Sequence, residues 1–266
     1  MSGFFNPTVA GITLRATLGR KRALLFAVPA LILILFTVAL KATHPPSRPW
    51  PSHVLGTFGF SVLLPLTALI IGTSVLGAEI DDGSIIHLLA TPVRRSSVIM
   101  TKFAVATALT VVFAAVPELI AALISGGGSA PPQASNGPGG VILYGPGAAI
   151  SGGKFALGLF VGALVSSIVY NAIFVMVSVA TTRAIAVGLL YVLIWESLLS
   201  NFVSGARLLS VSHYGLGIAN GIAHDPGLDA GLGVPTSVVM GVIVTVAALA
   251  VAVNLLSSFT LKGDPA

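Results

Sequence analysis

The chain of 266 residues is 55% hydrophobic and only 8% charged, with a mean hydropathy of +1.02. Soluble domains carry about 25% charged residues, so this composition excludes a soluble protein and predicts helices that cross a membrane, where each helix satisfies its own backbone. The net charge of +5 is expected to report topology rather than nucleic-acid binding. Because the chain has no cysteine, disulfides and cysteine-based metal sites are excluded.

Residues 1–22 are predicted to form an amphipathic helix at the membrane interface. Asn6 followed by Pro7 is typical of a helix start. The expected apolar stripe comprises Phe5, Val9, Ile12 and Ala16. The basic run 20–22 favours a cytoplasmic membrane edge, where anionic headgroups attract it. An unstructured basic tail is the alternative.

Residues 23–266 are expected to form a six-helix transmembrane domain. The predicted spans are residues 23–40, 54–76, 103–124, 155–180, 184–203 and 236–259. The predicted outer loops are residues 41–53, 125–153 and 204–235, and the cytoplasmic loop is 77–102. The first span, at about 27 Å, is just long enough to cross. The second outer loop is rich in Gly and Pro, which argues against a folded domain there, and the third is expected to hold small helices that dip toward the membrane.

Two further patterns concern packing and sidedness. Gly158, Gly162 and Ser166 lie four residues apart and form a small-residue stripe that allows close helix packing. We expect this packing within the subunit, with a dimer seam as the alternative. Nine of the thirteen Lys and Arg residues fall on the predicted inner side, which predicts that both termini are cytoplasmic.

The most polar stretch runs from Gly77 to Lys102, GAEIDDGSIIHLLATPVRRSSVIMTK. Asp81 or Asp82 can cap a short helix, and Pro92 ends it because the preceding residue is pushed out of the helical region. The stretch therefore predicts a short helix across the end of a membrane hairpin. A solvated loop that only joins two spans is the alternative.

This stretch resembles the ABC-2-type permease family. The pattern is Glu-x-x-x-Gly, then Leu-Leu, x-x-Pro, basic residues and a Lys in the next span. The matching residues here are Glu79, Gly83, Leu88, Leu89, Pro92, Arg94, Arg95 and Lys102. The stretch from Trp195 to Ile222 is similar to the family as well. The resemblance implies an all-α integral membrane protein with six transmembrane helices of the type V exporter-like permease fold, an N-terminal interfacial helix and a cytoplasmic coupling helix.

The resemblance also implies partners. Two permease copies, expected as a homodimer in a bacterial plasma membrane, would work with two copies of a cytoplasmic ABC ATPase, usually as an exporter. ATP and Mg would be bound by that ATPase and not by this chain. The residues expected to couple the two subunits are Glu79, Asp82, Gly83, Leu88, Leu89, Pro92, Arg94 and Arg95.

The chain itself has no recognisable ATP site. A phosphate-binding loop needs glycines before Gly-Lys-Ser/Thr, whereas the single Gly-Lys pair, Gly153-Lys154, continues into Phe155 in an outer loop. We therefore expect a non-enzymatic permease subunit. The apolar spans suit a hydrophobic or amphipathic substrate such as a drug, an antibiotic or a lipid. The alternatives are a membrane assembly or binding protein without transport activity and an ion-coupled secondary transporter.

Two acids lie within the predicted spans, Glu118 and Glu196, both near outer ends. Each could line a translocation path or serve a structural role, and for Glu196 the structural role is preferred. The absence of other charges in the spans disfavours ion coupling. The five histidines show no ligand spacing, so no metal site is predicted.

Overall fold

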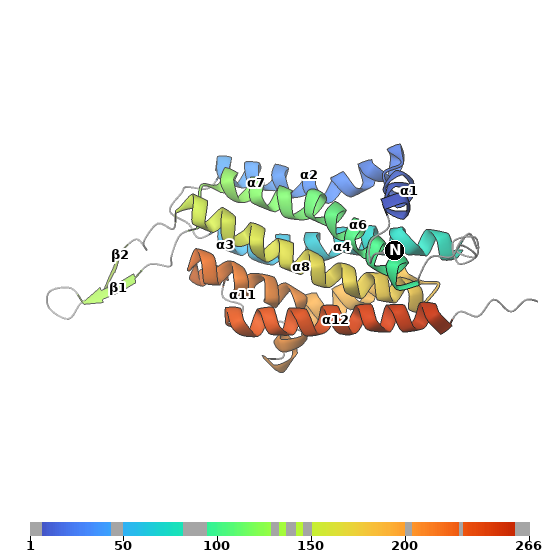
Figure 1. The fold of residues 1–266 in the computed structure, drawn as a ribbon. Coiled ribbons are helices and arrows are strands. Elements are labelled where there is room, and N and C mark those ends of the chain that lie inside the picture. Colours follow the sequence, from blue (N-terminus) through green and yellow to red (C-terminus); the bar gives the residue numbers. More distant parts are fainter. Residues whose placement is uncertain are drawn as a thin grey trace, which may run out of the picture.

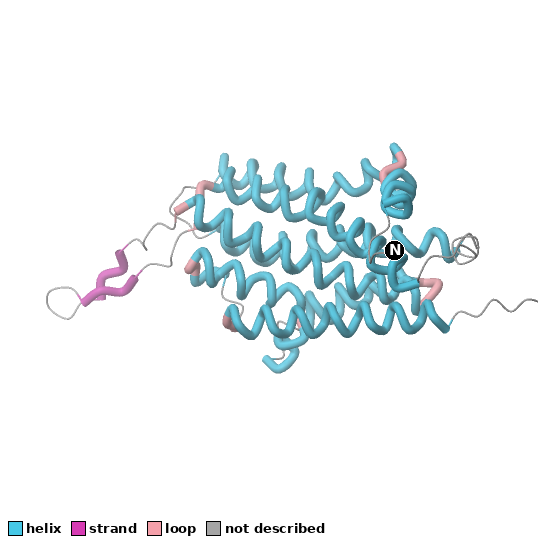
Figure 2. Tube along the Cα trace, viewed as in Figure 1, coloured by secondary structure: helices cyan, strands magenta, loops and turns pink. Residues whose placement is uncertain are grey.

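The computed structural model describes residues 7–43, 50–81, 95–128, 133–136, 142–145, 151–199, 204–228 and 231–258. In these ranges the chain forms a bundle of long helices that lie roughly side by side, with a strand pair projecting from one end (Figures 1 and 2). The helix α1 and the C-terminal end of α12 lie at the opposite end of the bundle.

Each long helical stretch is built from one element or from several joined end to end. The first two helices are α1 (Pro7–Thr17) and α2 (Arg20–Thr43). The next stretch joins α3 (Trp50–His53), the π-helical segment η1 (Val54–Leu63) and α4 (Leu64–Asp81). Then follow α6 (Arg95–Thr110), the π-helical η2 (Val111–Ala115) and α7 (Val116–Ser125). The remaining long helices are α8 (Gly152–Ala180) and α12 (Val234–Ser258).

Five stretches of the described chain are long and apolar enough to cross a membrane: Ala23–Thr43, Trp50–Leu76, Arg95–Ser125, Gly152–Ala180 and Val234–Ser258. The protein is therefore a multi-pass membrane protein. The predicted span 184–203 is represented by α9 (Ala184–Leu190) and the π-helical η4 (Tyr191–Leu199), whose apolar part, Ala184–Glu196, is shorter than a full span. A sixth crossing remains a prediction.

The region between η4 and α12 contains short helices. They are the 3-10 helix η5 (Ser204–Leu209), α11 (Val211–Ala223) and the 3-10 helix η6 (Pro226–Leu228). Of these, α11 is largely buried and packs against α8 and α12. The chain that follows η4 thus returns into the bundle before α12 begins.

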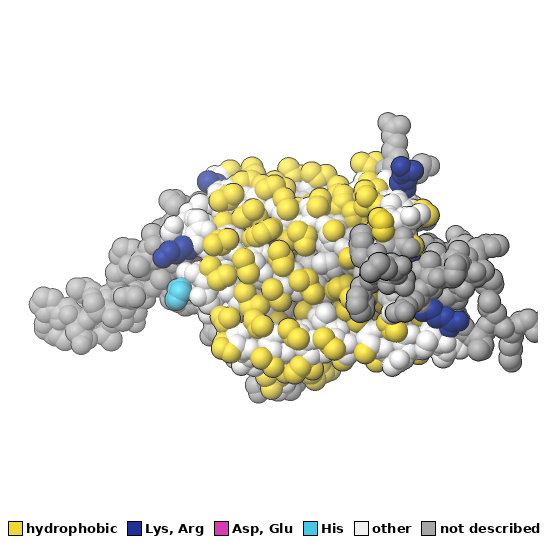
Figure 3. Space-filling model, in the orientation of Figure 1, with side chains coloured by type: hydrophobic (Ala, Val, Ile, Leu, Met, Phe, Trp, Pro, Cys, Tyr) yellow, Lys and Arg dark blue, Asp and Glu magenta, His cyan; other side chains and the backbone are white. Residues whose placement is uncertain are grey.

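The helix α8 occupies the centre of the bundle and packs against α4, α11 and α12. The large exposed hydrophobic side chains lie mainly on α2, α9 and α12. On the face that Figure 3 shows, hydrophobic side chains form a broad belt, with Lys and Arg side chains toward its two ends. This distribution fits helices whose outer faces meet hydrocarbon and whose ends meet water and headgroups.

The small-residue stripe of α8 packs within the subunit, as predicted. A Cβ atom at Gly158 would lie 2.6 Å from the carbonyl oxygen of Ala219, and one at Gly162 would lie 2.4 Å from that of Gly215. Such distances leave room for hydrogen only, so the backbones of α8 and α11 are in direct contact. The preference for intrasubunit packing over a dimer seam is therefore confirmed for these glycines.

The helix α1 covers the middle of the segment predicted as amphipathic, and it packs against α6. Its buried face is Val9, Thr13 and Thr17, spaced four residues apart. Ile12 of the predicted apolar stripe instead exposes 61% of its surface. The face of α1 that packs against the bundle thus contains Val9 and two threonines, whereas Ile12 of the predicted apolar stripe points away from the bundle.

A strand pair lies in the predicted outer loop 125–153. The strands β1 (Gln133–Asn136) and β2 (Ile142–Gly145) pair antiparallel, with Gln133 opposite Gly145. Within the described ranges the membrane bundle itself is all-helical, as predicted, and the strand pair projects from its end. The Gly and Pro content indicated no folded domain, and a lone pair of four-residue strands is not one, since an isolated hairpin is marginal by itself.

Candidate functional site

Most of the predicted coupling stretch lies outside the described residues. This holds for Asp82, Gly83, Leu88, Leu89, Pro92 and Arg94, so the short helix expected there stays a prediction. Glu79 belongs to the last turn of α4. The structure does describe how the far end of this stretch, from Arg95 onward, joins the bundle.

Arg95 opens α6 and contacts the end of α12. Its Nη1 atom donates to the carbonyl oxygens of Leu256, at 3.0 Å, and Ser257, at 2.6 Å. The last carbonyls of a helix have no intrahelical donor, and a cation there also meets the negative end of the helix dipole. Arg95 therefore connects the predicted coupling stretch to the C-terminal end of α12.

Lys102 lies about two turns further along α6 and is fully buried. Its ammonium group donates to the carbonyl oxygen of Val75 on α4 at 2.8 Å. A buried ammonium needs such a partner because its transfer from water is costly. Together, Arg95 and Lys102 connect α6 to α12 and to α4.

Glu196 lies in the last turns of η4, and its side chain reaches the start of α11. Its carboxylate accepts hydrogen bonds from the backbone N–H of Val211 at 2.8 Å and of Ser212 at 3.3 Å. The hydroxyls of Ser210 and Ser212 donate to it at 2.6 and 2.7 Å, and that of Tyr191 at 3.0 Å. The first N–H groups of a helix lack partners, so Glu196 caps α11 from within the bundle.

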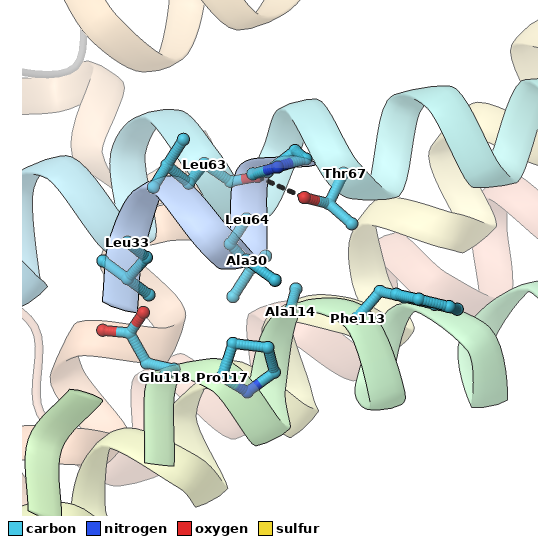
Figure 4. Close-up of a pocket in the computed structure, with 10 residues that line it drawn as sticks. Ala30, Leu33, Leu63, Leu64, Thr67, Phe113, Ala114, Pro117 and Glu118 are labelled. Atoms are coloured by element: carbon cyan, nitrogen blue, oxygen red, sulfur yellow. Dashed lines mark hydrogen bonds between the residues drawn. The ribbon is translucent and has the colours of Figure 1, made fainter. Parts of the chain in front are cut away.

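Glu118 has a different environment. It lies on α7, exposes 2% of its surface, and its Oε1 atom has no hydrogen-bond partner within the described part of the chain. The side chain points from α7 toward Leu33 of α2 (Figure 4). The two acids of the predicted spans therefore differ: one is surrounded by donors, and the other faces hydrocarbon.

Asp225 is a buried acid that the sequence analysis missed. It follows α11, and its carboxylate accepts a hydrogen bond from the hydroxyl of Ser52 on α3 at 2.5 Å. It also accepts one from the backbone N–H of Gly227 at 2.9 Å. The available signal was Asp-Pro-Gly, a turn pattern, which indicates local structure and not a contact 173 positions away.

Metal binding finds no support in the described ranges, where no three His, Asp or Glu side chains lie close enough together to hold an ion. His213 instead takes part in the polar cluster at the start of α11, with Nδ1 2.9 Å from the hydroxyl of Ser210. The candidate site therefore comprises the polar stretch between α4 and α6 and the buried Glu118, whereas Glu196 caps α11 outside it.

The family comparison bears on this arrangement. Residues 18–137 match the model of the family described as ABC-2 family transporter protein. This segment belongs to the ABC-2 transporter family. The predicted ABC-2-type permease is thereby confirmed, and the matched ABC-2 segment contains α2, the two following helical stretches and the whole polar loop between α4 and α6.

The ABC-2 match also bears on catalysis and partners. Permeases of this family are membrane components that are generally non-catalytic and associate in general with an ABC ATPase. No curated protein is significantly similar to the chain.

Proposed function

We propose that the chain is the membrane-spanning subunit of an ATP-driven exporter for hydrophobic or amphipathic compounds. It would act as a homodimer with two copies of a separate ABC ATPase, in a bacterial plasma membrane with both termini cytoplasmic. The observation that carries the proposal is the family match over residues 18–137, which includes the polar loop. ATP and Mg would act on the partner ATPase.

The contacts at the end of the loop support a mechanical role. A displacement of the loop by an ATPase would pull on Arg95 and Lys102. Through their hydrogen bonds, that displacement would reach α12 at Leu256 and α4 at Val75. Closure of the ATPase dimer on ATP would then bias the helical bundle between two arrangements, which is how a bound ligand shifts a conformational equilibrium.

The test is purification of the full chain from its native membrane in mild detergent, followed by identification of what remains bound. We expect an ABC ATPase with nucleotide-binding motifs, and ATP-dependent uptake of hydrophobic dyes into inside-out vesicles. A lone oligomer without ATPase would favour the assembly-protein alternative. Flux driven by an ion gradient in the absence of ATP would favour the secondary transporter.

A further inference from the structure

Glu118 is buried, and one oxygen of its carboxylate has no hydrogen-bond partner in the described part of the chain. An ionised carboxylate removed from water without compensating hydrogen bonds or a cation is costly by several kcal/mol. Its Oε1 atom is nevertheless enclosed by the bundle with no donor in the described ranges. An acid kept in such a position within a membrane bundle is a functional-site candidate, and the open question is the partner that it meets.

The backbone opposite the acid is shaped to admit it. Gly59 of η1 faces the carboxylate, and a Cβ atom there would lie 2.6 Å from both of its oxygens. Any residue other than glycine would force the acid or η1 to move. The close approach therefore requires the absence of a side chain at position 59.

A small cavity adjoins Glu118 where three helices meet (Figure 4). It has a volume of about 10 Å³, and its walls include Leu33 of α2, Leu64 of α4, Phe113 of η2, and Pro117 directly before the acid. This volume holds roughly one water molecule. Thr67 also lines it, but its hydroxyl donates to the carbonyl oxygen of Leu63 at 2.8 Å. No Lys, Arg or His lines this cavity.

The helices around the cavity are irregular at the same level. Pro29 and Pro117 line it, and Pro65 directly follows Leu64. The π-helical segments η1 and η2 adjoin it as well. Proline removes a backbone hydrogen bond, and π-helical turns often occur at functional sites. The walls of the cavity can therefore bend where the acid lies.

We propose that Glu118 is the cation-recognising residue of a substrate site for amphipathic cations. When the surrounding helices bend apart, the carboxylate would pair with the positive group of the ligand. Leu33, Leu64 and Phe113 would contact its apolar part, and the Phe113 ring can also attract a cation. The inference rests on the proposed function only in treating the ligand as cargo, since binding itself needs no ATPase.

The first experiment measures binding of radiolabelled tetraphenylphosphonium, a permanent apolar cation, to the chain in lipid nanodiscs. Glu118→Gln should weaken binding at least tenfold, because the amide removes the negative charge and little volume. Glu118→Asp should keep most of the affinity. Glu196→Gln is the matched control: it removes a buried charge outside this cavity and should change the affinity by less than about threefold. Equal binding by the parent and Glu118→Gln would overturn the proposal.

The second experiment needs no variant and so remains decisive if Glu118→Gln does not fold. Dicyclohexylcarbodiimide, an apolar reagent, modifies carboxyl groups within membranes, and peptide mass spectrometry locates the product. Saturating tetraphenylphosphonium should prevent modification at Glu118 and leave any modification elsewhere unchanged. Unchanged modification of Glu118, or failure of the parent to bind the cation with or without nucleotide and ATPase, would refute the assignment.

The two proposals fail in different ways. Glu118-dependent binding by a chain that purifies without an ATPase would retain the cation site and reject the ATP-driven exporter. A copurifying ATPase together with binding that ignores Glu118 would retain the exporter and reject the site.

Discussion

At the scale of single residues, the same side chain has two different settings in this bundle. The carboxylate of Glu196 is bonded by the backbone at the start of α11 and by three hydroxyls, whereas Glu118 Oε1 has no partner in the described part. Their positions in the sequence look alike, since each lies near the outer end of a predicted span. The difference comes from what packs against them.

The setting of Glu196 predicts how its variants behave. Glu196→Gln should keep most transport activity. Its free energy of unfolding should fall by about 1 kcal/mol, because an amide preserves the shape but not the charge at the helix start. Glu196→Leu leaves the buried N–H groups of Val211 and Ser212 without an acceptor, at roughly 1–3 kcal/mol each, so its folded yield should fall. Thermal unfolding monitored by size-exclusion chromatography measures both. Normal folding of both variants with loss of transport in both would assign a function to the charge.

The contact between Ser52 and Asp225 predicts a second effect at this scale. Ser52→Ala removes a donor from a buried carboxylate and should destabilise the protein by roughly 1.5–3 kcal/mol, as for hydrogen bonds to charged groups. Ser257→Ala is the control, since that hydroxyl bonds within its own helix at an exposed position, and it should change stability by less than about 0.5 kcal/mol. Equal melting temperatures of the two variants would show that the hydrogen bond between Ser52 and Asp225 does not stabilise the contact between α3 and the chain after α11.

At the scale of elements, α11 and α8 depend on each other through backbone contact. Gly162→Ala places a methyl group against the carbonyl of Gly215, and we expect a loss of roughly 1–3 kcal/mol from overpacking. Gly153→Ala is the matched control in the same helix, where the nearest atom to the new Cβ lies 4.0 Å away. It should be neutral or stabilising by up to about 1 kcal/mol, because alanine favours the helix. Melting temperatures that change equally would remove the case for close packing.

The coupling stretch carries the prediction for function at this scale. Replacing Leu88 and Leu89 together with Ser should weaken the binding free energy of the ATPase by several kcal/mol, because burial of each leucine at the contact contributes roughly 1.5–3 kcal/mol. The ATPase should then dissociate or lose its coupling to transport. The membrane bundle should be unaffected, because both residues lie outside the predicted spans. The readouts are ATPase copurification and substrate-stimulated ATP hydrolysis. A well-folded double variant that matches the parent in both would reduce the loop to a linker.

At the scale of the whole molecule, the proposed topology places one end of the bundle in the cytoplasm and the other outside the cell. The helix α1 and the end of α12 lie at one end and the strand pair at the other (Figure 1). A cysteine introduced at Asn136 of β1 should therefore react with an impermeant thiol reagent in intact cells, and one at Ser84 should not. The absence of native cysteines makes the reading unambiguous. Labelling at Ser84 with none at Asn136 would invert the proposed topology.

The sequence by itself predicted five helical stretches that the structure shows to be long and apolar enough to cross a membrane, and it showed the resemblance to the ABC-2 family; the sixth span stays a prediction. Hydropathy over some twenty residues is a local property, and the ABC-2 pattern around Glu79, Gly83 and Lys102 is read directly along the chain. The small-residue stripe of α8 also indicated close packing, because its spacing puts the three residues on one face.

The tertiary structure alone decided which groups meet. That α11 packs on the stripe of α8, that Glu196 caps α11, and that Ser52 reaches Asp225 all depend on segments between 15 and 173 positions apart. It also decided that Glu118 faces Gly59 and lines a small cavity. Hydropathy records whether a residue enters the membrane, but the partner of a buried polar group is fixed only when the helices pack, because that partner comes from another helix.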